Sequence, residues 1–78
     1  MYNRENADAE YLVLLGKRIK SVRKEKGIKQ VDLAYSCDIE KQSMNRLEAG
    51  KTNPSILLLR KIAEILGISV SELLNFNI

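Results

Sequence analysis

Apolar residues recur three and four positions apart between widely spaced glycines, and this spacing restricts the fold more than any other feature of the sequence. Residues with this spacing lie on one face of an α-helix and form the stripe that a half-buried helix turns toward a core. Patterns typical of β-strands are absent from the sequence. The two clearest series are Leu12, Leu15, Ile19 and Val22, and Leu59, Ile62, Ala63 and Leu66. The sequence therefore predicts an all-α fold.

Helix start and stop signals divide this pattern into five predicted helices. They cover about residues 10–26, 30–37, 41–49 and 55–66, and a fifth begins at the sequence SVSE, residues 69–72. Ser69 and Glu72 have the spacing of a capping box, in which each side chain accepts a hydrogen bond from the backbone N–H of the other residue. Gly16 interrupts the first predicted helix, at a cost of about 1 kcal/mol relative to alanine.

The length of 78 residues allows one domain with a small core. We assign residues 10–78 to this domain and residues 1–9 to a polar N-terminal extension. With Cys37 as the one cysteine and no histidine, the composition excludes a disulfide framework and an ordinary zinc site, so no cofactor is expected. No apolar run approaches the length of a membrane span, and the first residues are too polar for a secretory signal. We therefore expect a cytoplasmic protein without a membrane partner.

The net charge of +3 conceals a segregation of charge along the chain. Residues 1–15 and residues 62–78 each carry a net charge of −2, whereas residues 16–61 carry +7. A basic middle between acidic ends is typical of a protein that turns one face toward a polyanion. A solvated helix surface can have the same composition.

Only residues 38–40 separate the second and third predicted helices. So short a connection forces a sharp corner, and apolar residues on both sides of it can meet on the inside of the bend. These residues are Leu33, Ala34, Ile39, Met44 and Leu47. The small side chain of Ala34 lets the two helix backbones approach closely.

The third predicted helix has an apolar side and a polar side. At about 100° per residue, Met44 and Leu47 point one way. In the major groove of DNA, Arg or Lys pairs with guanine, and Asn or Gln pairs with adenine. The polar side carries four side chains of these types, Lys41, Gln42, Asn45 and Arg46. This side is therefore either a surface that reads bases or an ordinary solvated helix face.

The stretch KQVDLAYSCDIEKQSMNRLEAGKTNPS, residues 29–55, resembles the helix-turn-helix of the Cro/C1 repressor family, also called the XRE family. The flanking sequences LGKRIKSVRKEKGIKQ and LLLRKIAEILGISVSELL resemble the other helices of this family. The resemblance covers about residues 15–74. It implies a five-helix, Cro/C1 repressor-like DNA-binding domain in which the second and third helices form the helix-turn-helix.

The resemblance also implies a role for each matching position. Base readout would fall to Lys41, Gln42, Asn45 and Arg46. Contacts to DNA phosphates would come from Gln30, Lys29, Ser43, Lys51, Thr52 and Asn53. Gln30 would use both its side chain and its backbone amide. Arg23 and Glu48 would form a structural ion pair that joins the first helix to the end of the third.

Three positions depart from the family pattern. Asp38 stands where the family usually has glycine in the turn, and aspartate tolerates left-handed backbone better than most residues. Lys29 and Glu40 stand where Ser or Thr often caps a helix. Glu40 also places a negative charge near the expected DNA surface, where it could accept a hydrogen bond from a cytosine amine or repel phosphates.

The C-terminal sequence LLNFNI carries more apolar bulk than we expect a five-helix monomer to cover. Members of the family commonly pair through this end, so the resemblance implies a homodimer whose interface contains Leu73, Leu74, Phe76 and Ile78. A symmetric dimer would place two recognition helices about 34 Å apart, over a near-palindromic site. In the alternative, Phe76 and Ile78 fold back onto their own core.

Two functions remain open on the sequence alone. The first is a sequence-specific regulator of transcription, expected to be a repressor, that binds double-stranded DNA. The second is an antitoxin-like module that holds a partner protein such as a toxin, with DNA binding secondary. An enzyme is not expected, because the sequence offers no nucleophile with a base and no glycine-rich phosphate loop. A membrane-surface helix at residues 12–29 fits poorly, because the core needs its apolar stripe.

Overall fold

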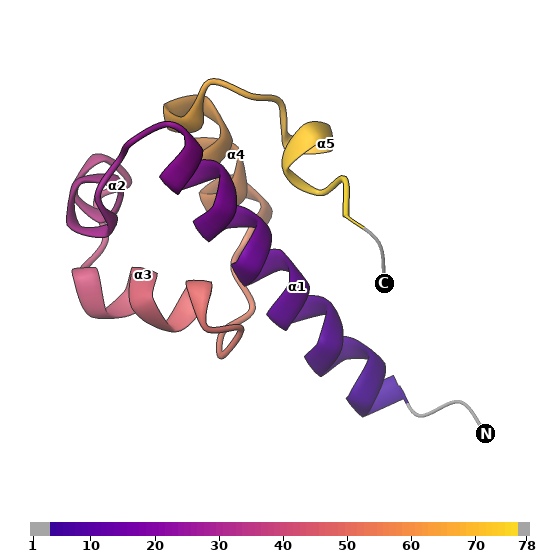
Figure 1. Ribbon diagram of the computed structural model, residues 1–78. Coiled ribbons are helices and arrows are strands. Elements are labelled where there is room, and N and C mark those ends of the chain that lie inside the picture. The colour runs from indigo at the N-terminus through magenta and orange to yellow at the C-terminus, as the bar shows by residue number, and fades with distance from the viewer. Residues whose placement is uncertain (1–3, 77–78) are drawn as a thin grey trace.

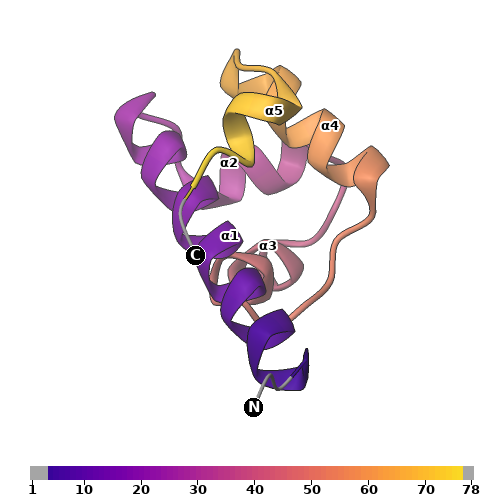
Figure 2. The ribbon, with the colours of Figure 1, turned by 90° about the vertical axis from the view of Figure 1, so that its right-hand side faces the viewer.

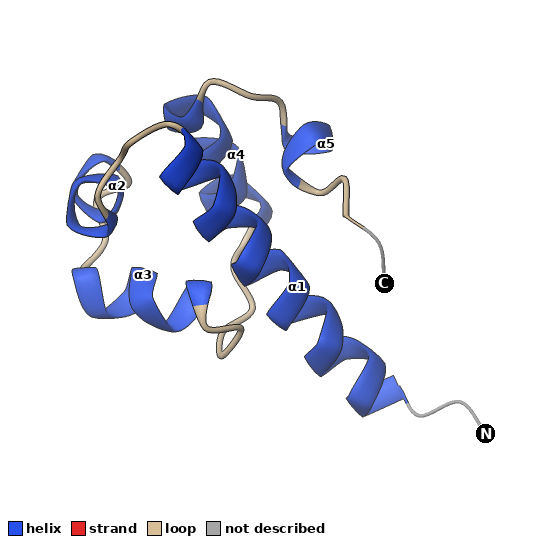
Figure 3. Cartoon of the chain, viewed as in Figure 1, coloured by secondary structure: helices blue, strands red, loops and turns tan. Residues whose placement is uncertain are grey.

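The computed structural model describes residues 4–76, and within this range its regular elements are helices joined by loops, without strands (Figures 1 and 3). The helices are α1 (Arg4–Glu25), α2 (Gln30–Ser36), α3 (Lys41–Glu48), α4 (Ile56–Leu66) and α5 (Val70–Leu73). The prediction of an all-α, five-helix domain is confirmed. Four of the five helices lie within one or two residues of the expected positions.

The helices surround one apolar core. α2 packs on α3 and α4, α1 packs on α3, and α4 packs on α5. Apolar residues that are spaced three and four apart in the sequence supply most of the buried side chains, as the pattern predicts. The core residues are Leu15, Ile19, Val22, Leu33, Ala34, Cys37, Met44, Leu47, Leu59, Ile62, Ala63, Leu66 and Leu73. Four of the five residues expected inside the bend are fully buried, and Ile39 packs against them half-buried.

Helix α1 begins at Arg4, so the expected start near residue 10 is wrong. The apolar stripe begins near residue 10, but this stripe indicates which residues are buried and not where the backbone is helical. Residues 4–9 contain neither proline nor glycine, and Ala7 and Ala9 favour a helix. In Figures 1 and 2 the N-terminal part of α1 extends beyond the other helices. The division of the chain at residue 10 stays a prediction.

Gly16 and Gly50 let α1 lie directly against the end of α3. A β-carbon on Gly16 would come within 2.5 Å of the carbonyl oxygen of Glu48. Because this oxygen belongs to the backbone, no side-chain rotation could relieve the clash. Gly50 has a left-handed φ of 76°, and a β-carbon there would lie 2.6 Å from the Cα of Val13. The glycine in α1 therefore serves a close helix contact, which explains why the helix accepts its conformational cost.

Hydrogen-bonded caps set the ends of α4 and α5. The backbone N–H of Leu58 donates to the Oγ of Ser55 at 3.1 Å, so Ser55 is the cap of α4. The capping box of α5 is confirmed: Glu72 N–H donates to Ser69 Oγ, and Ser69 N–H donates to Glu72 Oε1, both at 3.0 Å. The bond from the Ser69 backbone N–H, followed by a bond from the Ser69 hydroxyl to the same carboxylate oxygen at 3.2 Å, lowers the pKa of the Glu72 carboxyl.

The C-terminal segment packs on its own chain. Leu73 has no exposed surface, and its assignment to a dimer interface is therefore corrected to the core. Leu74 and Phe76 are half-buried, and the Phe76 ring lies 5.1 Å from the Tyr11 ring, centroid to centroid. Arg18 Nη2 donates to the Glu72 carbonyl oxygen at 2.9 Å and ties α5 to α1. Ile78 lies outside the described residues.

Candidate nucleic-acid interface

A rigid corner joins α2 to α3. Figure 1 shows α2 almost end-on while α3 runs across the view, so the two helices cross steeply. Asp38 adopts the left-handed φ of 61° that the sequence led us to expect. The N–H of Ile39 donates to the Ala34 carbonyl at 3.0 Å, and the Cys37 side chain is buried beneath the turn. Backbone bonds and burial together fix the direction in which α3 leaves the corner.

Helix α3 has a buried back and a free front. Met44, Leu47 and Glu48 are 0%, 2% and 6% exposed, respectively, and hold the helix to the core. The four proposed reading residues are all exposed. Within residues 4–76, none of their side chains has a hydrogen-bond or ion-pair partner. They are Lys41, Gln42, Asn45 and Arg46. The front of α3 is therefore a surface of unpaired donors and acceptors.

A buried ion pair anchors the end of α3. Arg23 Nε lies 2.7 Å from Glu48 Oε2, and Arg23 Nη2 donates to Glu48 Oε1 at 3.1 Å, so the pair is bidentate as expected. Arg23 Nη1 donates to the Ile28 carbonyl at 2.8 Å. Gln30 Nε2 donates to Glu48 Oε1 at 2.9 Å. This network joins α1, the following loop, the start of α2 and the end of α3, and therefore fixes the pose of α3.

Gln30 is held differently from the expectation. One N–H of its side-chain amide is bound to Glu48, so the side chain is not entirely free to grip a phosphate. Sequence reasoning missed this contact because the two residues are 18 positions apart and belong to different helices. Lys29 is exposed and, like Glu40 before α3, makes no side-chain cap bond. The role of Lys29 and Gln30 toward phosphate stays a prediction.

The loop after α3 adjoins the exposed polar front of α3. A hollow of about 340 Å³ between α3 and this loop is lined mainly by apolar surface, and also by polar residues that are candidates for contacts to bases and phosphates. These polar residues are Ser43, Arg46, Thr52 and Asn53. Lys51 in the same loop is exposed. Arg46, a proposed base contact, and three proposed phosphate contacts therefore lie around one hollow between α3 and the loop.

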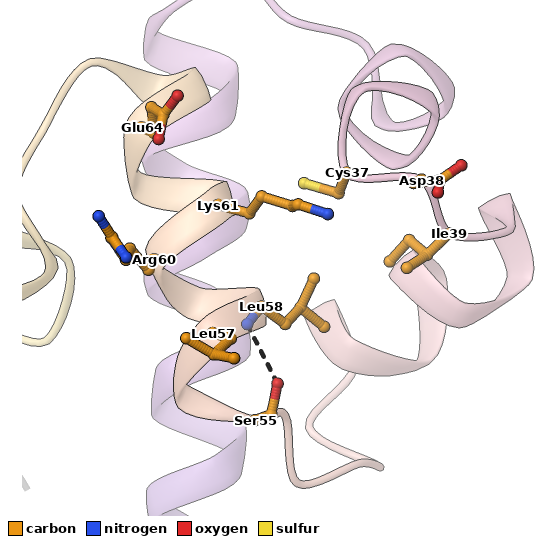
Figure 4. Close-up of a pocket in the computed structure, with 9 residues that line it drawn as sticks. All are labelled: Cys37, Asp38, Ile39, Ser55, Leu57, Leu58, Arg60, Lys61 and Glu64. Carbon is orange, nitrogen blue, oxygen red and sulfur yellow. Dashed lines mark hydrogen bonds between the residues drawn. The ribbon is translucent and has the colours of Figure 1, made fainter.

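A larger hollow of about 740 Å³ lies between the turn and α4 (Figure 4). Cys37 and Lys61 point toward each other across it. Burial raises the pKa of the Cys37 thiol, and the charge of Lys61 only partly opposes this effect. The thiol is therefore a packed, weakly acidic group. Arg60 and Lys61 on the wall are matched by Asp38 and Glu64, so the hollow favours neither sign of ligand.

Two large apolar side chains at the start of α4 are exposed, and sequence reasoning did not single them out. Ile56 is 63% exposed and Leu57 is 68% exposed. The signal was present in the spacing, because Leu57 falls on the side of α4 opposite the buried stripe. Within the described chain, no helix is at once long and apolar enough to cross a bilayer.

Two short helices joined by a tight corner, the second with a buried back and an unpaired polar front, define a helix-turn-helix protein. A family model described as helix-turn-helix matches residues 19–73, more than half of the chain. The chain therefore belongs to the helix-turn-helix family, in its Cro/C1 or XRE form.

Known relatives and structures agree with this assignment. The HTH-type transcriptional regulator SinR of Bacillus licheniformis is 41% identical over 63 residues, which cover 80% of this chain and 57% of that protein. The chain thus spans little more than half the length of that regulator. The restriction-modification controller protein C.AhdI of Aeromonas hydrophila has a TM-score of 0.76 at 32% identity, over 80% of this chain and 94% of that one. SinR in complex with DNA has a TM-score of 0.71 at 40% identity, over 78% of this chain and 98% of that one.

Proposed function

We propose that the protein is a sequence-specific, non-catalytic regulator of transcription that binds double-stranded DNA, and that it acts as a repressor in the cytoplasm. The observation that carries this proposal is the free front of α3, whose exposed side chains have no partner in the described chain while the back is fixed by Met44, Leu47 and Glu48. Such a surface meets the requirement for direct readout, since base edges can satisfy the unpaired groups. The DNA complex of SinR supports the same use of this fold.

The proposed contacts divide into two kinds. Lys41, Gln42, Asn45 and Arg46 read bases from the front of α3, and the loop residues Lys51, Thr52 and Asn53 hold the phosphate backbone together with Ser43, Lys29 and Gln30. Contacts to phosphates set the register and supply affinity that depends on salt, whereas contacts to bases supply the preference for a sequence. The free carbonyl and second N–H of the Gln30 side chain remain available when the first N–H is bound to Glu48.

We further propose that the protein acts as a homodimer on a near-palindromic site. Leu74 and Phe76 are half-buried and retain some surface for a second copy, and Ile56 and Leu57 offer more exposed apolar area beside the DNA-contacting loop. A symmetric pair would place the two α3 helices about 34 Å apart on one side of the duplex. The relatives do not favour the alternative of a toxin-binding module, since they are named transcriptional regulators and controllers.

Selection of preferred duplexes from a random pool tests the proposal. We expect a near-palindrome whose two halves are centred about one helical turn apart, bound with an affinity that falls steeply as salt increases. Sedimentation of the wild type and of Leu57→Ser, with and without the selected duplex, measures whether each protein is a monomer or a dimer. A pool that shows no enrichment at low salt would contradict the function. An enriched single half-site bound by a monomer would contradict only the dimer.

A further inference from the structure

We propose that Glu40 is a specificity-determining residue that selects cytosine at one position of each half-site. This inference rests on the proposed function and names the base that the N-terminal end of α3 prefers. It decides between two uses of the residue that the sequence leaves open, namely a contact to a cytosine amine and a general repulsion of phosphates.

Glu40 stands at the end of α3 that enters the groove. It is the residue before Lys41, with φ −73° and ψ 151°, and its side chain is exposed. In helix-turn-helix proteins the N-terminal residues of the recognition helix contact base edges. The carboxylate makes no cap bond to the helix, and within residues 4–76 it has no ion-pair partner. In the described chain, the Glu40 side chain therefore has no hydrogen-bond or ion-pair role within the protein.

Glu40 has no ion-pair partner in the described part of the chain. It lines a hollow of about 530 Å³ together with Tyr35, Asp38, Ile39 and Ser43. None of these neighbours is a cation, and Asp38 adds a second carboxylate. Desolvating such an unpaired carboxylate against another acceptor is unfavourable, so the group needs a donor when DNA covers it.

Glu40 differs in kind from the four side chains beside it on the reading surface. Lys41 and Arg46 only donate, and Gln42 and Asn45 can donate or accept. Glu40, when ionised, only accepts. In the major groove guanine and thymine present acceptors, adenine presents an amine beside the acceptor N7, and cytosine presents its N4 amine. An acceptor-only side chain therefore favours cytosine and disfavours guanine and thymine at the base that it meets.

The test compares duplexes selected from a random pool by the full chain and by two variants. Glu40→Gln keeps the shape of the side chain but removes its charge and adds donors. Glu64→Gln is the matched control, because it makes the same change of charge at an exposed residue of α4. Circular dichroism establishes that both variants fold. Binding is then measured on the selected site and on duplexes with each other base at the affected position.

We expect the wild type and Glu64→Gln to require cytosine at one position per half-site and Glu40→Gln to lose that requirement. The ratio of affinities for cytosine over guanine or thymine should fall roughly five-fold or more in Glu40→Gln. If Glu40→Gln instead binds every duplex more tightly by one common factor and keeps its base preferences, the inference is overturned and Glu40 only repels phosphates. A wild-type chain without any base preference would overturn the proposed function as well, so the two failures are distinguishable.

Discussion

Gly16 of α1 and Glu48 of α3 lie in backbone contact, so close that a β-carbon on Gly16 would meet the Glu48 carbonyl oxygen at 2.5 Å. We expect Gly16→Ala to lower the free energy of unfolding by about 1–3 kcal/mol, because the added carbon forces two helix backbones apart. Urea denaturation measures this change. Gly67→Ala is the control: its φ of 74° is strained for alanine, but nothing lies within 4 Å of the added carbon. A Gly16→Ala protein as stable as the wild type would show that the helices can move apart freely.

Arg23 and Glu48 should depend on each other for stability. Arg23→Met removes one partner and leaves the Glu48 carboxylate buried, which we expect to cost about 3–5 kcal/mol. The double variant Arg23→Met/Glu48→Met removes both charges. Its loss of unfolding free energy should be smaller than the sum of the losses caused by the two single changes. A cycle of denaturation measurements gives the coupling energy. Strictly additive changes would show that the pair contributes no specific interaction.

Asp38 in the turn should be replaceable by glycine without loss. Its φ of 61° costs an L-residue roughly 1–2 kcal/mol, whereas glycine adopts this conformation freely but loses more entropy on folding. We therefore expect Asp38→Gly to be neutral or more stable by up to about 1 kcal/mol. Asp38→Val should be clearly less stable, because a β-branched residue tolerates this region poorly. Thermal melts of the two variants check this order of stability. Equal melting temperatures would show that the backbone at residue 38 is not strained.

Arg46 and Lys51 should affect DNA binding in different ways. Arg46→Ala is expected to cost about 1–3 kcal/mol on the preferred site and to relax selectivity at one base pair. Lys51→Ala should weaken all duplexes alike and reduce the salt dependence by about one ion. Titrations of the selected site and of single-base variants at several salt concentrations separate these effects. If both variants lose the same affinity on every duplex, the division between base and phosphate contacts is wrong.

The Glu72 cap should contribute to stability in a pH-dependent way. The Ser69 backbone N–H, followed by the Ser69 hydroxyl, lowers the pKa of the Glu72 carboxyl in the folded state. A lowered pKa means that the ionised group stabilises the fold above its ordinary pKa and that this stabilisation is lost as the pH falls through the lowered value. The difference in unfolding free energy between the wild type and Glu72→Gln should thus be constant from about pH 7 to about pH 5 and shrink toward about pH 3. A difference that grows on acidification would show that folding raises the pKa of the Glu72 carboxyl instead of lowering it.

Features set by local sequence were predictable. The capping box of Ser69 and Glu72 acts over three residues, and the left-handed turn at Asp38 was indicated by the resemblance to a family that usually has glycine at this position. The buried side of α3 follows from the spacing of Met44 and Leu47. In each case the physical cause lies within one or two helical turns of the chain, where sequence order and spatial order coincide.

Features set by tertiary contacts were not predictable from the sequence alone. Gly16 has no local signal that distinguishes a close helix contact from a weak point in a helix. The bond from Gln30 to Glu48 joins residues that only the finished fold brings together. Leu73 has the composition of either a core or an interface residue, and the packing of α5 on α4 decides for the core.

The separation of the back of α3 from its front has an evolutionary consequence. The residues that hold this helix in place are distinct from those whose side chains have no partner in the described protein. Exchanges among exposed, unpaired side chains usually alter stability by no more than about 0.5 kcal/mol. Under the proposed function, a lineage could therefore drift to a new operator by changing Gln42 or Asn45 while the scaffold stays intact, so duplicated copies could diverge in target before either lost the ability to fold.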